Sequence, residues 1–298
     1  GPDAMIDALI GAGTEEKAAR MFTFAVMKKK LPPTFVEMNG RGAIMREANG
    51  PRRALNVEGL DALDLRTFKP NGDHWDFNLR SNRNEARRLI DKLRPTWVIG
   101  SPPCTPFSIW NQNMNFPKMD KDRVRAYMEE GRRHLNFMAS IYRKQLLLRG
   151  HFLHEHPATA LSWAEPGIAA LARHPMVHCV VADQCQYGLV TPSQHDPKVK
   201  LPAMEPTRFM TSSPQIAAVL NRRRQKDHVD QQFVGGRAAR AAWYSKGLVR
   251  AILLGIKNTA IAEGAKIDVR ERDRVGVHSL ASARGQNSQP SVDRKSVV

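Results

Sequence analysis

The chain has 298 residues, long enough for one α/β domain with a sizeable core and short appendages. Its three cysteines are too few for a disulfide framework, and it shows no secretory signal or run of ~18 apolar residues. We therefore expect an intracellular protein, in the nucleus or the cytoplasm, with no membrane partner. The formal net charge of +17 favours nucleic acid as the partner, with a basic tail on an ordinary enzyme as the alternative.

The first predicted element occupies residues 1–31, where a tag remnant at Gly1–Ala4 precedes a helix rich in Ala and Glu. Pro32 and Pro33 end this helix. Thr34–Met38 is β-branched and apolar and predicts the first strand.

A glycine-containing loop, Asn39-Gly40-Arg41-Gly42, follows the first strand. The chain then predicts a short helix over residues 43–48 and a second strand over residues 53–57. Glu58 and Asp61 come directly after that strand.

The rest of the chain alternates between helical and strand patterns. Helices are predicted over residues 84–93, 120–148, 168–173, 214–223 and 238–256, and strands over residues 96–100, 151–157, 177–181 and 208–211. This alternation predicts an α/β fold, a doubly wound and mostly parallel sheet within residues 32–263. Residues 264–298 lose hydrophobic periodicity and predict a basic, disordered tail.

The most informative segment is Ser101-Pro102-Pro103-Cys104-Thr105-Pro106-Phe107-Ser108, which directly follows a buried strand pattern. The two prolines before the cysteine fix their own φ and restrict their neighbours, so a stiff backbone holds the thiol. A small buried hydrophobic residue is the alternative role for Cys104. The rigid mount favours a nucleophile, whose pKa we expect to be lowered by a helix N-terminus and basic groups.

The chain resembles the cytosine-5 DNA methyltransferases. That family has Pro-Pro-Cys and then Phe-Ser after a strand, and a glutamate at the end of the next functional strand, as in His154-Glu155-His156-Pro157. The glycines after the first strand and the fragment Gln186-Tyr187-Gly188 also resemble family segments. The match covers roughly residues 34–255 and is similar to diverged methyltransferase-like domains of eukaryotic and mobile-element polyproteins. It implies a Rossmann-like S-adenosylmethionine-dependent methyltransferase fold.

The resemblance also implies roles for individual residues. Cys104 and Glu155 would be catalytic. Contacts to S-adenosylmethionine would come from Met38, Gly40, Gly42, Glu58 or Asp61, Asp76 and Pro102. Contacts to the nucleic acid would come from Ser101, Phe107, Ser108, Asn111, His156, Lys198, Lys200, Arg237 and Arg240. Trp243 and Tyr244 either contact phosphates and bases or cap the last helix.

The implied reaction is methylation of cytosine C5 in a nucleic acid, with DNA favoured over RNA. Cys104 would add to C6 and so make C5 nucleophilic, which splits one slow step into easier ones. Glu155, as a partly protonated carboxyl, would bind the N3 and N4 edge of the base. A salt-bridged glutamate at a strand end is the alternative.

The sequence departs from the family at several positions. Thr105 stands where the family usually has Gln, and Glu37 is one place closer to the glycines. No Gln-x-Arg-x-Arg follows Gly188, so Lys198, Lys200 or Arg208 would have to serve. Only about 35 residues separate Lys200 from Gly235, too few for a large target-recognition domain. The resemblance therefore extends to the reaction and not to the choice of target sequence.

Three other functions fit parts of the sequence. A catalytically inactive methyltransferase-fold module would bind nucleic acid through its basic surface. A zinc site would use His154, His156, Cys179 and Cys185, although the two cysteines are spaced more widely than in a zinc knuckle. A cysteine hydrolase would pair Cys104 with a histidine base.

Overall fold

The computed structural model describes residues 32–51, 55–193, 196, 198–225 and 244–263, with isolated positions between residues 6 and 16. The chain forms two compact units, residues 1–31 with 266–298, and residues 32–265. All elements described below belong to the second unit. Apart from the isolated positions, the predicted N-terminal helix lies outside the described residues, as does the predicted tail over residues 264–298.

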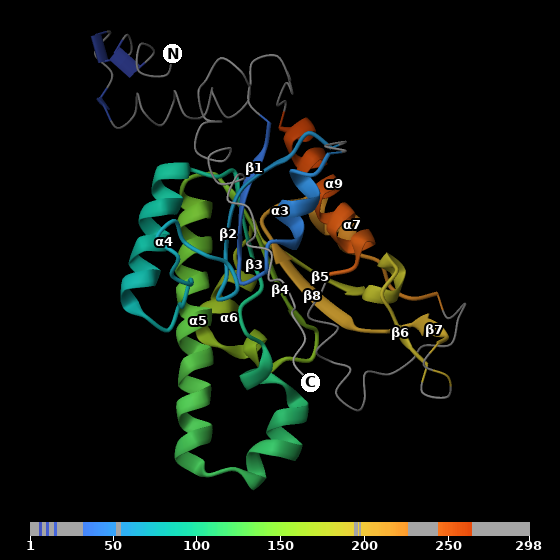
Figure 1. Cartoon of the computed structure of the whole chain (residues 1–298). Helices are drawn as coiled ribbons and strands as arrows, with labels where there is room; N and C mark the ends of the chain where they lie inside the picture. Colours follow the sequence, from blue (N-terminus) through green and yellow to red (C-terminus); the bar gives the residue numbers. More distant parts are fainter. Residues whose placement is uncertain are drawn as a thin grey trace, which may run out of the picture. The chain divides into compact units, whose positions relative to one another are not determined.

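A six-stranded sheet forms the centre of this unit, in the order β2-β1-β3-β4-β8-β5 (Figure 1). The strands are β1 (Thr34–Met38), β2 (Glu58–Leu63), β3 (Trp97–Gly100), β4 (His151–Pro157), β5 (His178–Asp183) and β8 (Pro206–Thr211). β2, β1, β3 and β4 pair in parallel, whereas β8 is antiparallel to both β4 and β5. The prediction of a mixed α/β fold with a mostly parallel sheet is confirmed.

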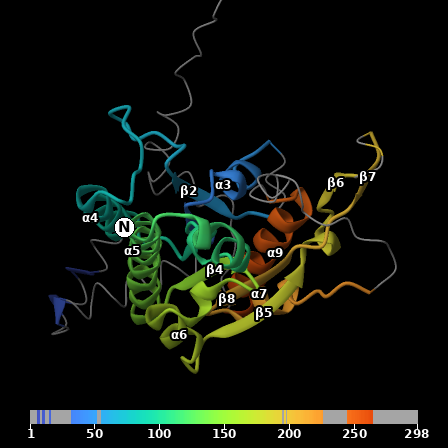
Figure 2. The same cartoon turned by 90° about the horizontal axis from the view of Figure 1, so that it is seen from below.

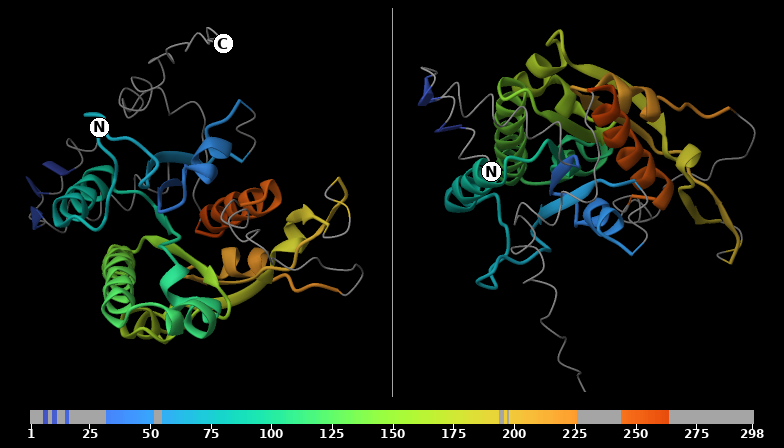
Figure 3. Two further views of the ribbon diagram at one scale, coloured as in Figure 1. Left: turned by 60° about the horizontal axis from the view of Figure 1, so that its bottom comes forward. Right: turned by 90° about the horizontal axis from the view of Figure 1, so that it is seen from above.

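Helices cover both faces of the sheet (Figures 2 and 3). One face carries α4 (Arg80–Leu93), α5 (Lys121–Leu147) and α6 (Pro166–Ala172), and the other carries α3 (Ala43–Ala48), α7 (Pro214–Leu220) and α9 (Lys246–Ala262). Successive strand residues point to opposite faces, so Val36 and Met38 pack with the first layer and Phe35 with the second. Because β3 is buried on both sides, its sequence Trp97–Gly100 is a continuous apolar run.

Shorter elements connect or extend these layers. They are η1 (Thr105–Phe107), η2 (Asn111–Asn115), η3 (Phe116–Lys118), η4 (Leu161–Ala164), η5 (Gln184–Tyr187), β6 (Val190–Pro192) and β7 (Lys200–Pro202). β6 and β7 pair with each other as a separate hairpin. Among the described residues, no helix is both long enough and apolar enough to cross a membrane.

The second strand differs from its prediction. It spans Glu58–Leu63 instead of residues 53–57, because Asn56 has a φ of 50° that turns the chain before the strand begins. β2 is an edge strand, which tolerates the acidic Glu58 and Asp61 better than a central strand would. Glu58 therefore starts the strand and lies away from the edge where β1 ends.

The last helix also begins later than predicted. α9 starts at Lys246, where the Ser245 hydroxyl accepts a hydrogen bond from Leu248 N at 3.1 Å. Residues 238–243 of the predicted helix lie outside the described residues.

The order of the strands creates one switch point. From β1 the chain moves outward to β2 and then crosses to β3 on the other side of β1. In open α/β sheets, the crevice at the carboxyl ends of the strands at such a point is the usual ligand site. These ends form the lower edge of the sheet in Figure 1, and Ser101 N donates to Met38 O there at 3.1 Å.

Candidate active site

The turn after β3 holds Cys104 at the carboxyl edge of the sheet. Cys104 is half-buried, and its carbonyl oxygen accepts a hydrogen bond from Phe107 N at 2.9 Å in the η1 turn. The Phe107 side chain is fully buried among the core residues on the α5 side. A buried anchor on one side and the two prolines on the other hold the thiol in place.

Glu155 lies on the neighbouring strand β4, and its side chain is hydrogen-bonded to a residue that is distant along the chain. The Tyr244 hydroxyl, just before α9, donates a hydrogen bond to Glu155 Oε2 at 3.0 Å. The same hydroxyl is hydrogen-bonded to Ser101 Oγ, in the turn that leads to Cys104. Tyr244 thus connects the ends of β3 and β4.

The predicted low pKa of Cys104 is wrong for this structure. Burial, together with the nearby carboxyl groups of Glu155 and Glu205, raises the pKa of the thiol to about 12. The expected helix N-terminus and basic groups do not offset these effects, so the thiol is protonated at neutral pH. Cys104 is close enough to Glu155 for the carboxylate charge to affect the pKa of the thiol. Cys104 can act as a nucleophile only when a change in its surroundings lowers this pKa.

Burial also raises the pKa of Glu155 to about 7, although the hydroxyl groups of Tyr244 and Ser101 lower it. At neutral pH this carboxyl group is both a usable acid and a usable base, because its pKa lies near the pH. Glu205, half-buried just before β8, likewise has a pKa raised by burial. A thiol and two carboxyl groups therefore meet at this edge.

The two histidines that flank Glu155 point to the opposite face of β4. His156 Nε2 donates to Pro102 O at 2.7 Å, so its Nδ1, at 2.6 Å from Ser162 Oγ, accepts from that hydroxyl. His156 is buried, and burial lowers its pKa to about 4. Both ring nitrogens of His156 are hydrogen-bonded within the protein, so His156 stabilises the turn at Pro102 and is not free to bind a substrate.

The zinc interpretation is not supported. No group of three or more His, Cys, Asp or Glu side chains among the described residues has an arrangement that could hold a metal ion. The hydrolase interpretation finds no base among the described residues, where carboxyl groups and not a histidine shift the pKa of Cys104.

The glycine loop after β1 has a structural explanation. The buried Glu37 carboxylate accepts hydrogen bonds from Ala43 N, Ile44 N and Met45 N at 3.0–3.1 Å and so fills the N-terminus of α3. A Cβ atom at Gly40 would lie 2.8 Å from Glu37 Cγ, and Gly42 has a φ of 71°. Both glycines are therefore required by the protein's own packing, whether or not a ligand approaches them.

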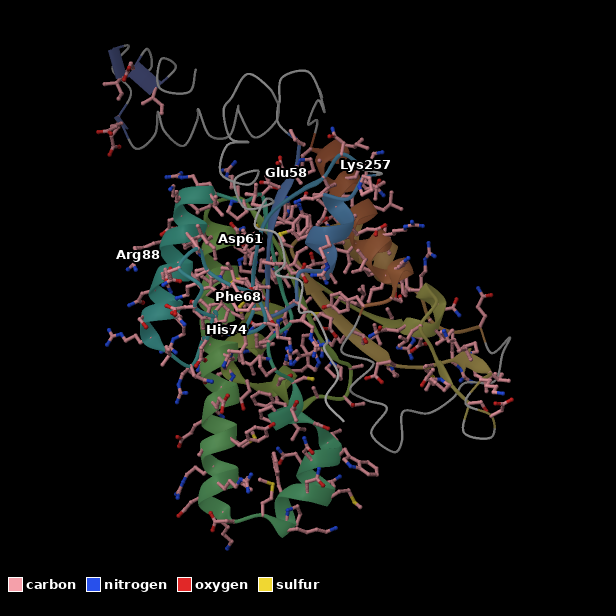
Figure 4. All side chains as sticks on the ribbon, viewed as in Figure 1. Glu58, Asp61, Phe68, His74, Arg88 and Lys257 are labelled. Carbon is pink, nitrogen blue, oxygen red and sulfur yellow. The ribbon has the colours of Figure 1, made fainter. Side chains whose placement is uncertain are left out.

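The acids expected near the ribose are distributed along β2. Figure 4 shows Glu58 at the far end of the strand from the loop that carries Phe68 and His74, with Asp61 between them. The acid at the carboxyl end of β2 is instead Asp64, which is buried and accepts from Arg66 N at 2.9 Å. Asp76 is half-buried and accepts from Asn78 N before α4.

The switch point suits a cationic ligand that carries polar groups. Asn39, at the end of β1, has a buried Oδ1 atom without a hydrogen-bond partner. A phosphate would meet the Glu37 carboxylate at the N-terminus of α3, where such groups usually bind. The acceptors present, Asn39 at the end of β1 and Asp64 at the end of β2, fit a positively charged ligand with amino or hydroxyl groups. Met38 and Pro102, at the carboxyl ends of β1 and β3, are buried.

The residues expected to bind the substrate do not all gather at this edge. Ser101 and Ser108 are half-buried beside the Cys104 turn, and Asn111 Nδ2 donates to Thr105 O at 2.7 Å. Lys198 and Lys200 are exposed around the β6–β7 hairpin. Arg237 and Arg240 lie outside the described residues, and Phe107 is fully buried.

No protein-family model matches the chain, and a search of curated protein sequences finds no match. The resemblance to cytosine-5 methyltransferases therefore depends on the motifs and their placement. Sequence reasoning did not assign Asp64 and Glu205 to the site, and it gave Tyr244 a different role. Of these three residues, only Asp64 is marked by the local sequence, because it is an acidic residue directly after the apolar Ala62-Leu63 pair. Tyr244 lies 89 residues from Glu155, and nothing in the local sequence marks the pair.

Proposed function

We propose that this protein transfers a methyl group from S-adenosylmethionine to C5 of cytosine in a nucleic acid, through a covalent bond to Cys104. One observation carries the proposal. A thiol on a rigid turn and a carboxyl group with a pKa of about 7 come from adjacent parallel strands and meet at the carboxyl edge of the sheet.

The sheet order adds support. An antiparallel strand, β8, lies between β4 and the edge strand β5 of an otherwise parallel sheet. This mostly parallel sheet, with helices on both faces, is compatible with the Rossmann-like fold that the resemblance implies. Asn39 at the carboxyl end of β1 and Asp64 at the carboxyl end of β2 would serve as acceptors for the cofactor, and Cys104 follows β3, the strand that pairs with β1.

In the proposed reaction, Cys104 attacks C6 of the cytosine ring and forms a sulfur–carbon bond, while the electron pair of the C5–C6 double bond moves toward C5. S-adenosylmethionine would supply an electrophilic methyl group to C5 and leave as a neutral thioether. A base then removes the C5 proton, the double bond re-forms, and the sulfur recovers the electron pair of its bond to C6.

Glu155 contributes in both directions of proton movement. In its protonated form it donates its proton to N3 of the base as the thiolate adds to C6, and N3 returns this proton to the Glu155 carboxylate when the sulfur leaves C6. The Cys104 thiol must lose its proton first, and its pKa of about 12 opposes this in the free protein. Because a positive charge nearby lowers a thiol pKa, a bound sulfonium favours the thiolate.

Incubation with tritium-labelled cofactor and a panel of single- and double-stranded DNA and RNA tests the proposal. We expect label in cytosine of at least one polymer, and none with the Cys104→Ser variant, which should still bind the cofactor. Absence of label from every polymer, or label at the parental rate with Cys104→Ser, would contradict it.

A second candidate function is a non-catalytic module that binds nucleic acid. The high pKa of Cys104 and the net charge of +17 favour this function. Such a module would bind nucleic acid with an affinity that falls steeply as salt rises, because phosphate contacts dominate. It would release no saturable heat with S-adenosylmethionine in calorimetry, whereas the enzyme would.

A further inference from the structure

The geometry points to Tyr244 as a positioning residue, whose hydroxyl group, held by Ser101, fixes the carboxyl group of Glu155 beside the Cys104 turn. The part of this inference that concerns catalysis rests on the proposed function, whereas the part that concerns the carboxyl group does not.

Tyr244 is itself held firmly by the residues that follow it. The Ser245 hydroxyl donates to Tyr187 O at 2.7 Å and accepts from Leu248 N at 3.1 Å. A Cβ atom at Gly247 would lie 2.8 Å from the Tyr187 carbonyl carbon, so only glycine allows this approach. The start of α9 therefore cannot shift without breaking these contacts.

The hydrogen bonds also determine where an acid proton sits. The Tyr244 hydroxyl donates its single hydrogen to Glu155 Oε2, so the Ser101 hydroxyl donates to the Tyr244 oxygen. Because Oε2 already accepts a hydrogen bond, a proton on the Glu155 carboxyl group is favoured on Oε1. Tyr244 thus determines which oxygen of Glu155 can donate to a ligand.

Tyr244 stays protonated under these conditions. Burial, and then the charge of Glu155, raise the pKa of its hydroxyl group well above the usual value. The titratable groups that affect Glu155 and Cys104 come from several elements: Cys104 after β3, Glu205 before β8, and Tyr244 before α9. Tyr142 of α5 also has a pKa raised by burial and by Glu155. Among these groups, Tyr244 is the one that donates a hydrogen bond to the carboxyl group.

The inference is tested with Tyr244→Phe in the full chain. Selective ¹³C labelling of glutamate carboxyl groups and NMR titration give the pKa of Glu155, whose signal is assigned by its loss in Glu155→Gln. The hydrogen bond stabilises the ionised carboxylate, so its removal should raise this pKa by roughly half a unit to one unit. Tyr187→Phe is the matched control, because it removes a tyrosine hydroxyl from the same region without touching Glu155.

Catalysis provides a second readout. Tyr244→Phe should lower kcat about fivefold and move the pH–rate profile to higher pH, with cofactor affinity unchanged. An unchanged Glu155 pKa in Tyr244→Phe, or an equal shift in Tyr187→Phe, would overturn the inference. If no variant transfers label but the Glu155 pKa still moves, the proposed function fails and the positioning role stands.

Discussion

Two glutamates at the same edge of the sheet have the same raised pKa but different hydrogen-bond partners. Burial raises the pKa of both Glu37 and Glu155 to about 7. Glu37 accepts three backbone N–H groups and is almost completely covered by protein. Glu155 is half-buried and accepts from one tyrosine hydroxyl beside a thiol.

The difference shows that a perturbed pKa does not by itself define a catalytic residue. The Glu37 carboxylate has its hydrogen-bonding capacity used by the start of α3, so its role is structural. The Glu155 carboxyl group has fewer protein partners and a nucleophile as its neighbour. Substitutions at the two positions should therefore affect different properties.

The largest expected effect is on the chemical step. Glu155→Gln should lower the rate of methyl transfer about 10²- to 10⁴-fold, because the amide cannot donate an acid proton to the base. The rate is measured with labelled cofactor, and Glu205→Gln is the matched control that removes a neighbouring carboxyl group. A Glu155→Gln variant with the parental rate would show that this carboxyl group takes no part in the reaction.

The next effect concerns the stability of the β1 loop. Gly40→Ala places a Cβ atom against the Glu37 side chain and should lower the free energy of unfolding by about 1–3 kcal/mol. In a Glu37→Ala background the same change should cost clearly less, because the clashing side chain is gone. Chemical denaturation of all four proteins measures this coupling. An equal cost in both backgrounds would mean that Gly40 is required for another reason.

The smallest effect is the dependence of stability on pH. Both carboxyl groups ionise near pH 7 when folded and near their ordinary value of 4.5 when unfolded, so the folded state binds more protons between these values. Their contribution is present below about pH 4.5 and is lost as the pH rises through about 7. Glu37→Gln and Glu155→Gln should each flatten the fall in melting temperature over this range. A slope that stays unchanged in both variants would contradict the raised pKa values.

Local sequence signals predicted most of the fold. The first strand over residues 34–38 and the helix over 43–48 match β1 and α3, because short apolar runs and a flanking glycine loop determine them locally. The strand at 58–63 was missed, because its tolerance of two acids depends on its position at the sheet edge. Edge position is a tertiary property that a strand pattern does not encode.

The candidate site was predictable only in part. A proline-stiffened turn marks Cys104, and a strand end marks Glu155, so both residues could be selected from the sequence. The pKa of Cys104 could not be predicted from the sequence, because it depends on burial and on Glu205, which is distant along the chain. Tyr244 shows the same limit, because its link to Ser101 spans 143 residues.

Covalent trapping tests the central claim most directly. An oligonucleotide that contains 5-fluorocytosine should form a stable complex with the protein in the presence of S-adenosylmethionine, because fluorine at C5 cannot leave as a proton does. Peptide mass spectrometry should then place the methylated base on Cys104, and Cys104→Ser should form no complex. A trapped base on Cys179 or Cys185, or no complex although both ligands bind, would contradict the assignment of Cys104 as the nucleophile.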